Sequence, residues 1–249
     1  FHKAVDTGIY AWLQEKKKEG VIRNFGFSFH GYATDLETIL SEGSFDFVQL
    51  QLNYLDWELQ NAKLSYETVT RHGLPVMVME PVRGGALTTL PEEAEKAMKE
   101  MHPDATLASW AFRWVGSLEN VLVVLSGMNT IEMLEDNLNT FSGLQCITKE
   151  EEEVLDRTRK LVLASRTIPC TKCQYCMPCT VGIQIPNTFA LYNKFLLDGD
   201  KKAFQDGYKT LEHKGSECVS CKKCMKACPQ GINIAEHMKQ LDRTVMSLS

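Results

Sequence analysis

Apolar residues between position 7 and about position 145 follow two alternating spacings. Segments with apolar residues three and four positions apart, typical of amphipathic helices, are separated by short runs of Val, Ile, Phe and Leu, typical of buried strands. This alternation favours a parallel sheet, because parallel strands need a long crossover to join them. The predicted strands are residues 22–27, 47–51, 75–80 and 121–125, and the predicted helices are 7–19, 34–43, 58–72, 91–101, 105–116 and 130–140.

Each predicted strand is followed by polar or glycine-containing residues. The carboxyl ends of strands carry the chemistry in parallel βα folds, so these residues form the candidate site of this region. Four strands cannot close an eight-stranded barrel, and an open four-stranded sheet leaves apolar edge strands uncovered. The residues that follow the strands are Ser28 to Gly31, Asn53 with Tyr54, Pro81 to Gly85, and Ser126 with Gly127.

Eight of the nine cysteines lie in two tight runs near the C-terminal end. Cysteines separated by two residues form a loop that can wrap one iron-sulfur cube and give thiolates to three of its irons. The fourth iron needs a ligand from elsewhere. The two runs are Cys170, Cys173, Cys176 and Cys179, then Cys218, Cys221, Cys224 and Cys228, the last followed by Pro229.

In two-cluster ferredoxins the fourth cysteine of each run ligates the other cube. On that pattern we predict two 4Fe-4S clusters. The first run departs from the second, because its last gap is two residues and Thr180 stands where proline is common. The predicted ligands are Cys170, Cys173, Cys176 and Cys228 for one cube, and Cys218, Cys221, Cys224 and Cys179 for the other.

Two other interpretations of the cysteine runs stay open. Paired Cys-x-x-Cys knuckles also build zinc sites, but zinc takes two cysteines per knuckle and leaves the third and fourth member of each run unused. Disulfides belong to oxidising compartments, and no signal peptide is evident in the sequence. The spacing favours iron-sulfur over either alternative.

Composition and charge bound the function further. The chain has 249 residues, 44% hydrophobic content and a net charge of −5, with both signs interspersed. We therefore expect no nucleic-acid partner. The longest apolar runs, residues 74–79 and 121–125, are too short to span a bilayer, so we expect no membrane partner and a soluble, cytoplasmic protein. Because the chain opens at Phe1 without a methionine, we expect a fragment.

The sequence predicts a helical structure for the residues from 149 onward. A helix is predicted over residues 149–164, with Thr148 as its N-cap and Glu151 closing a capping box. Pro169 then breaks the chain before the first cysteine loop. The spacer between the two runs carries helical rather than strand signals, which predicts a helical two-cluster ferredoxin module. Its predicted helices are residues 188–197, 201–212 and 234–245.

The alternating half resembles the second half of the aldo-keto reductases. The resemblance implies the fifth to eighth strands of a (β/α)8 TIM-type barrel, and a C-terminal cysteine module is similar to the iron-sulfur-containing branch of the family. The matching segments are Gly20-Val-Ile-Arg-Asn-Phe-Gly-Phe-Ser28, Gln51-Leu-Asn-Tyr54, Glu80-Pro-Val-Arg-Gly-Gly85, Ala111-Phe-Arg-Trp-Val115, and Ser126-Gly127 with Asp136-Asn137.

The resemblance also implies NAD(P) as a second cofactor. Ser28 and Gln51 match positions that hold the nicotinamide carboxamide, and Met79 occupies the place of the aromatic residue that stacks on the nicotinamide ring. Met79 offers a polarizable sulfur but no ring face. Gly127 and Met133 stand where a lysine and an arginine commonly clamp the adenosine 2′-phosphate, which removes charge-assisted support for NADP. The remaining predicted contacts of the cofactor are Ser126, Gly127, Thr130 and Asn137.

The family's catalytic tyrosine, aspartate, lysine and histidine come from the first four βα units, which would lie upstream of Phe1. We therefore assign no catalytic residue in this chain. Among other candidates, His30 lies at the end of a predicted strand, and Arg83 suits either a phosphate or a surface ion pair. Cys146 and the four tryptophans are expected in the core.

The predicted organisation is a partial barrel over residues 1–148, a connecting helix over 149–168 and a helical dicluster domain over 169–249. We predict an aldo-keto-reductase-type oxidoreductase coupled to electron transfer, with a small-molecule substrate and an external ferredoxin or flavoprotein as partners. One alternative is nicotinamide-dependent carbonyl reduction with purely structural clusters. The other is a zinc-stapled interaction module on a non-catalytic barrel.

Overall fold

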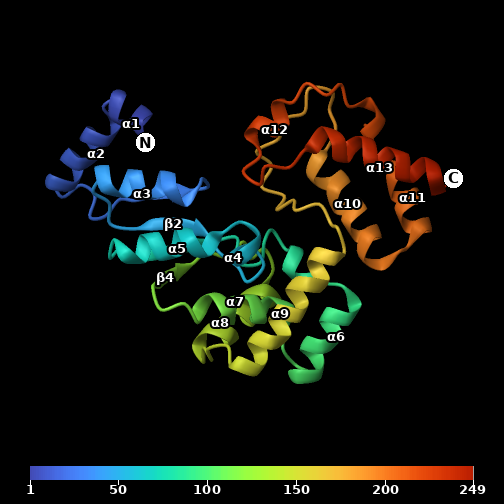
Figure 1. The fold of residues 1–249 in the computed structure, drawn as a ribbon, viewed down its shortest axis with the longest axis horizontal. Helices are drawn as coiled ribbons and strands as arrows, with labels where there is room; N and C mark the ends of the chain where they lie inside the picture. The colour runs from blue at the N-terminus through green and yellow to red at the C-terminus, as the bar shows by residue number, and fades with distance from the viewer. Residues whose placement is uncertain (249) are drawn as a thin grey trace. The chain divides into compact units, whose positions relative to one another are not determined.

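The computed structural model describes residues 1–248, which form two compact units (Figure 1). The first unit comprises Phe1–Pro81 and Ser109–Ile147. The second comprises Val82–Ala108 and the chain from Thr148 onward. Within residues 1–248, no helix combines the length and the apolar character needed to cross a membrane.

The first unit is built on a parallel sheet whose strands follow one another in chain order, β1-β2-β3-β4. Phe27 lies opposite Val48, Val48 opposite Val76, and Val76 opposite Val121. This confirms the parallel α/β arrangement predicted from the alternating pattern. The strands are β1 Phe27–Phe29, β2 Val48–Gln51, β3 Val76–Met79 and β4 Val121–Val124.

The first strand lies later in the chain than predicted, at Phe27–Phe29 rather than at residues 22–27. Phe25 donates its backbone N–H to Oδ2 of Asp46 at 2.9 Å, so a side chain takes the place of a strand partner. The ring of Phe25 also packs against Phe45 at a centroid distance of 5.7 Å. The apolar residues before β1 therefore belong to an aromatic cluster. Such a cluster is as hydrophobic as a buried strand, but its backbone makes no ladder of hydrogen bonds with a neighbouring strand.

One predicted helix of the first unit is interrupted, and another is preceded by a helix that was not predicted. The predicted helix 58–72 breaks at Asn61, where φ is +51°, and becomes two helices. The predicted helix 7–19 is observed as Ile9–Lys18, and Gly8, where φ is +77°, separates it from a short helix over His2–Asp6. A left-handed residue cannot continue a right-handed helix. The helices are α1 His2–Asp6, α2 Ile9–Lys18, α3 Ala33–Glu42, α4 Asp56–Leu59, α5 Ala62–Arg71, α7 Leu107–Gly116 and α8 Ile131–Ser142.

One face of the sheet forms the core of the first unit. Val48, Val76 and Val78 are fully buried and Leu50 is 2% exposed, while α3 packs on α5 and α5 on the strands β2 and β3. Burial of each such side chain contributes about 1.5–3 kcal/mol. The alternation along β2 and β3 thus places every second residue in the core and leaves Gln49 and Met79 on the opposite face, where Ser28 is the register partner of Gln49.

Some residues expected in the core lie on the surface. Trp12 is 56% exposed, although Trp110 and Trp114 are buried as predicted. Leu122 of the edge strand β4 and Leu138 of α8 are also exposed. Cys146 is exposed as well, since the segment before α9 runs along the surface and offers its side chain no pocket.

The second unit is helical. Its core contains Phe189, Phe204 and Met238, and the rings of Phe195 and Phe204 stack at 4.7 Å. The predicted helix 188–197 begins three residues earlier, because Pro186 is tolerated in the first turn, where its missing N–H has no helical partner. The elements are η1 Ala86–Thr88, α6 Glu92–Met101, α9 Lys149–Ala164, α10 Ile185–Asp198, α11 Lys201–Thr210, η2 Gly215–Glu217, α12 Lys223–Ala227 and α13 Ile234–Leu248.

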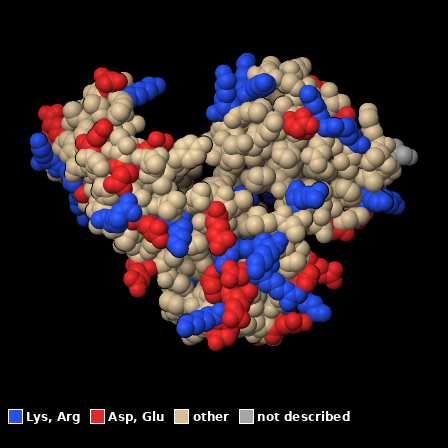
Figure 2. Space-filling view, viewed as in Figure 1, with Lys and Arg blue, Asp and Glu red and all other residues tan. Residues whose placement is uncertain are grey.

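Helix α9 begins with the predicted capping box. Thr148 Oγ1 accepts from the N–H of Glu151 at 3.2 Å, and Glu151 Oε2 accepts from the N–H of Thr148 at 2.7 Å. Helix α9 packs on α6, and Arg157 pairs with Glu93 between them. Figure 2 shows basic and acidic side chains interleaved over these two helices, as the sequence composition led us to expect.

Candidate functional site

The second unit contains a first cavity in which both cysteine runs meet. It is lined by Cys170, Cys173 and Cys176 of the first run and by Cys228 of the second. The rest of the lining is largely apolar, with Ile185, Phe189, Ile232 and Ile234 among it. The structure therefore brings together the four cysteines that the ferredoxin pattern assigned to one cube.

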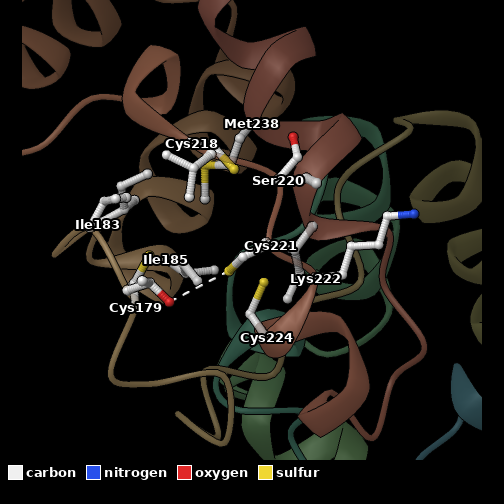
Figure 3. A pocket seen from close by; sticks show the side chains of 14 residues that line it. Cys179, Ile183, Ile185, Cys218, Ser220, Cys221, Lys222, Cys224 and Met238 are labelled. Carbon is white, nitrogen blue, oxygen red and sulfur yellow. Dashed lines mark hydrogen bonds between the residues drawn. The ribbon is translucent and has the colours of Figure 1, made fainter.

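A second cavity contains the other four cysteines. Figure 3 shows Cys179 on one side and Cys218, Cys221 and Cys224 around the remaining space, whereas the ammonium end of Lys222 extends away from it. Ile183, Ile185 and Met238 supply apolar walls. Each cavity thus combines three thiols of one segment with one thiol of the other, which ties the two segments together.

The two cysteine loops share a backbone pattern. In the first, Lys172 and Gln174 flank Cys173 with φ values of +57° and +65°. In the second, Ser220 and Lys222 flank Cys221 with φ values of +53° and +61°. Left-handed conformations cost roughly 1–2 kcal/mol for residues other than glycine, so their repetition at matching positions marks a constrained loop. This curvature lets a short segment surround a cavity.

Burial and neighbouring thiols raise the pKa of three of the cavity cysteines. Burial raises the pKa of Cys170, and it raises the pKa of Cys176 to about 11 with neighbouring Cys170, Cys173 and Cys228 adding to the effect. The pKa of Cys224 is raised by burial and by the thiols of its own cavity. A thiol must lose its proton to bind a metal, so cluster binding would release these protons.

Cys221 differs from the other ligand candidates. Thr180 Oγ1 lies 3.5 Å from its sulfur, and this hydrogen bond lowers the pKa of Cys221. Cys221 is also exposed, whereas the other seven cysteines of the two runs are partly buried. Cys221 is therefore the ligand candidate of the second cavity that solvent reaches most readily.

Within residues 1–248, no three His, Cys, Asp or Glu side chains converge closely enough to hold a single metal ion. The thiols are instead spread around each cavity in sets of four. Four surrounding thiolates in an apolar cavity are the ligand set that a 4Fe-4S cube requires.

In the first unit, three neighbouring strands bring three polar or polarizable side chains together on one face of the sheet. Gln49 donates from Nε2 to Oγ of Ser28 at 3.1 Å and to Sδ of Met79 at 3.4 Å. Ser28 and Met79 were predicted as cofactor contacts, but Gln49 was not. The signal was present in the sequence, because Gln49 and Gln51 are two positions apart and share one strand face.

Gln51, in contrast, belongs to a buried polar network. Its Nε2 donates to Oδ2 of Asp56 at 2.7 Å, and the residue is 8% exposed. Asn53 donates to the same carboxylate at 2.8 Å and to the carbonyl oxygen of Glu80 at 3.1 Å. These bonds join the ends of β2 and β3. Sequence reasoning had not singled out Asp56, whose burial follows only from packing.

The segment after β4 contains the other predicted cofactor contacts. Asn137 donates from Nδ2 to Oγ of Ser126 at 3.0 Å, so these two side chains lie together. Thr130 caps α8 by accepting from the N–H of Met133 at 3.3 Å, and it is exposed, as is Gly127. His30 is exposed just beyond the end of β1.

The loop after β3 contacts the first cysteine run within the second unit. Gly84 has φ +60°, and a Cβ there would lie 1.9 Å from the carbonyl oxygen of Thr171. Only glycine allows this approach of two backbones. Arg83 is 4% exposed, so the surface ion pair considered for it is wrong.

Two models of known protein families match the chain, one over the strand-containing region and one over the cysteine-rich region. A model described as the aldo/keto reductase family matches residues 4–157. The chain belongs to this family. A second model, described as a 4Fe-4S dicluster domain, matches residues 169–243. The resemblance drawn from the sequence motifs is therefore confirmed, and so is the combination of a reductase region with an iron-sulfur module.

Solved aldo-keto reductases are similar to the first of these regions. The holo form of AKR11C1 from Bacillus halodurans is 24% identical, with 58% of this chain and 53% of that chain covered and a TM-score of 0.48. Thermostable Tm1743 with the inhibitor epalrestat is 23% identical, with 60% and 53% covered and a TM-score of 0.49. A putative 2,5-diketo-D-gluconic acid reductase B is 24% identical, with 61% and 50% covered and a TM-score of 0.47. The chain thus spans about half the length of these structures. No curated protein matches the sequence.

Proposed function

We propose that this chain is part of an aldo-keto-reductase-type oxidoreductase coupled to electron transfer, and that its eight clustered cysteines hold two 4Fe-4S clusters. The observation that carries this proposal is the grouping of the cysteines into two sets of four, each drawn from both runs. Such clusters, when bound, accept and release single electrons.

The residues around each cavity fit this role. In the first, Phe189 and Ile232 exclude water, which lowers the local dielectric and disfavours the more negative reduced state of a cluster. In the second, the Thr180 hydroxyl contacts the sulfur of Cys221, and the exposed loop admits solvent. We therefore propose that the second set, Cys179, Cys218, Cys221 and Cys224, supports the higher reduction potential.

For NAD(P) we propose the strand face that carries Ser28 and Met79. Gln49 lies within hydrogen-bond distance of both, so its amide is placed to meet a carboxamide. Gln51 remains a predicted contact, but its amide already donates to Asp56. The proposed contacts with the adenosine part of NAD(P) are Ser126, Gly127, Thr130 and Asn137.

We propose no catalytic residue within this chain. The positions that would carry the family's catalytic tetrad have no counterpart in the matching motifs, and the chain spans about half of its solved relatives. The expected result is the absence of carbonyl reduction by this chain with NADH or NADPH across a panel of aldehydes and ketones. Turnover with any of them would contradict this assignment.

The partners that follow from this function are a small-molecule substrate and an external one-electron carrier, a ferredoxin or a flavoprotein. We propose a cytoplasmic setting, because cluster thiols need a reducing compartment. Neither a nucleic acid nor a membrane is proposed as a partner.

The first experiment is iron, acid-labile sulfide and zinc analysis of anaerobically purified protein. Two clusters require about eight irons and eight sulfides per chain. Zinc without sulfide would replace the proposal by a zinc-stapled module. Potentiometry with EPR detection then separates redox clusters from structural ones, because clusters that stay silent across the physiological range would rule out electron transfer.

A further inference from the structure

The two cysteine segments carry basic residues but no acidic ones. Residues 167–183 and 218–235 contain Lys172, Lys222, Lys223 and Lys226 but none of the 32 Asp and Glu residues of the chain. The protein as a whole has a net charge of −5. Positive charge is therefore concentrated where the clusters would be held.

Three of these lysines form one exposed group. Lys223 and Lys226 are three positions apart on helix α12, so their side chains share a face, and Lys222 is the N-cap residue directly before this helix. Among residues 1–248, no carboxylate lies within 4.0 Å of their ammonium groups. Figure 2 shows the basic side chains gathered over the region of α12.

The acidic residues that border this segment are already engaged. Glu217 pairs with His213 at 2.8 Å and accepts from the N–H of Lys214 at 2.6 Å. Glu236 pairs with Arg243 at 2.8 Å. Neither carboxylate neutralises the lysines of α12, so their charge is available to a partner.

Two of the lysines line hollows that also contain Cys221, Lys222 in the second cavity and Lys223 in a neighbouring one. Tyr175, Cys221 and Lys223 line one hollow, which opens between the two cysteine runs. Tyr175 is 62% exposed and Val219 is 60% exposed, and Cys221 is the exposed thiol of the second set. Positive charge, an aromatic side chain and an apolar side chain thus lie near Cys221, the exposed thiol of the second set.

We propose that Lys222, Lys223, Lys226, Tyr175 and Val219 form the docking surface for a small acidic one-electron carrier of the ferredoxin type. We call these five residues the basic surface. The inference rests on the proposed function, since it requires a cluster at Cys179, Cys218, Cys221 and Cys224. Opposite charge steers the carrier to this face, while the net negative charge of the protein repels it elsewhere. Tyr175 and Val219 supply the contacts that lose water at the centre of the interface.

The step at this surface moves one electron. The reduced carrier is oxidised by one electron, the cluster is reduced by one electron, and no covalent bond forms or breaks. A competing explanation is that the lysines only offset the negative charge of the cluster. Lys222 extends away from the thiols in Figure 3, which fits a partner in solution better than local compensation.

The test compares a Lys222→Glu, Lys223→Glu, Lys226→Glu triple variant with the unchanged protein. The probe is a plant-type 2Fe-2S ferredoxin, which is small and acidic. Its affinity is measured by calorimetry in the oxidised state, and electron transfer from its reduced form is measured by stopped flow, both at low and high salt. At low salt we expect about a tenfold or greater loss in affinity and rate, and a much weaker salt dependence.

The matched control is a Lys201→Glu, Lys202→Glu variant. These lysines are also exposed but belong to α11, outside the cysteine segments, so both measurements should stay within about twofold. A Lys→Gln triple variant at the same three positions should give an intermediate loss. Iron content and circular dichroism establish that each variant is folded and loaded.

The outcomes separate the inference from the function on which it rests. Photoreduced deazaflavin needs no docking surface and should reduce the clusters of every variant equally. Clusters that accept electrons from deazaflavin, together with unchanged ferredoxin affinity and rate in the triple variant, would overturn the basic surface alone. A shift in cluster potential without a change in ferredoxin affinity would show that the lysines only offset the negative charge of the cluster. This result would also overturn the basic surface. Absence of reducible clusters would remove both proposals.

Discussion

Asn53 donates from Nδ2 to Oδ2 of Asp56 at 2.8 Å, and both residues are fully buried. The same side chain accepts from the N–H groups of Leu55 and Asp56 at 3.1 and 2.8 Å. Gln51 donates to the same carboxylate oxygen, and Glu80 receives the other Asn53 bond on its backbone. Asn53 and Gln51 therefore both donate to the buried Asp56 carboxylate, and Asn53 also links the ends of β2 and β3.

We expect Asn53→Ala to lower the free energy of unfolding of the first unit by about 2–3 kcal/mol, because it leaves buried polar groups without partners. Urea unfolding followed by tryptophan fluorescence measures the loss. Asn24→Ala is the matched control, since Asn24 is exposed, and its effect should stay within about 0.5 kcal/mol. Equal effects of the two substitutions would show that the network does not stabilise the fold.

Cys228 is the one member of the second run that lines the first cavity. We expect Cys228→Ala to lose about half of the iron and sulfide, because one cube of four irons loses its fourth ligand. Cys179→Ala should do the same for the second cavity. The control is Cys146→Ala, an exposed cysteine outside both runs, which should retain all of the iron. Full iron retention in Cys228→Ala would refute the cross-over ligand assignment.

Gly84→Ala tests the contact between the loop after β3 and the first cysteine run. The new Cβ would lie 1.9 Å from the carbonyl oxygen of Thr171, so one of the two backbones must move. We expect a lower melting temperature and less iron bound by Cys170, Cys173 and Cys176.

Gly85→Ala is the matched control for this contact. Gly85 also has a positive φ, +86°, but its nearest neighbouring atom is 4.0 Å away. This substitution should cost only the strain of a left-handed alanine, about 1 kcal/mol, and leave the iron content unchanged. If the two alanine variants behaved alike, the contact with Thr171 would have no role in shaping the cysteine loop.

Asp46 makes the stability of the first unit depend on pH. The hydrogen bond from Lys17 lowers the pKa of Asp46, and the N–H of Phe25 adds to this. A carboxyl whose folded pKa lies below its unfolded value of about 3.9 contributes stability above that value, and the contribution disappears as the pH falls through the folded pKa.

We therefore expect Asp46→Asn to lower stability at neutral pH and to flatten the loss of stability below about pH 4. Thermal unfolding between neutral and acidic pH measures both effects. The control is Asp35→Asn, because Asp35 is exposed in the first turn of α3 and its side chain is distant in sequence from this ion pair. An acid profile identical to that of the unchanged protein would contradict the role of Asp46.

Local patterns in the sequence determined much of this protein. Alternating apolar spacings predicted a parallel sheet with crossover helices, and the capping box of Thr148 and Glu151 predicted the start of α9. Cysteine spacing predicted two loops for iron-sulfur chemistry, and the family resemblance followed from short motifs. These features depend on residues within a few positions of one another, so the chain encodes them locally.

Tertiary structure decided which side chains meet and which are buried, because these contacts join segments far apart in the chain. Only packing shows that Gln49 meets Ser28 while Gln51 is committed to Asp56. Only packing places β1 after the aromatic cluster. Hydrophobicity states that a side chain favours burial, but whether Trp12 or Cys146 is buried depends on which surfaces come to cover it. The meeting of Cys228 with the first cysteine run is decided in the same way, by the helical core that folds one run back onto the other.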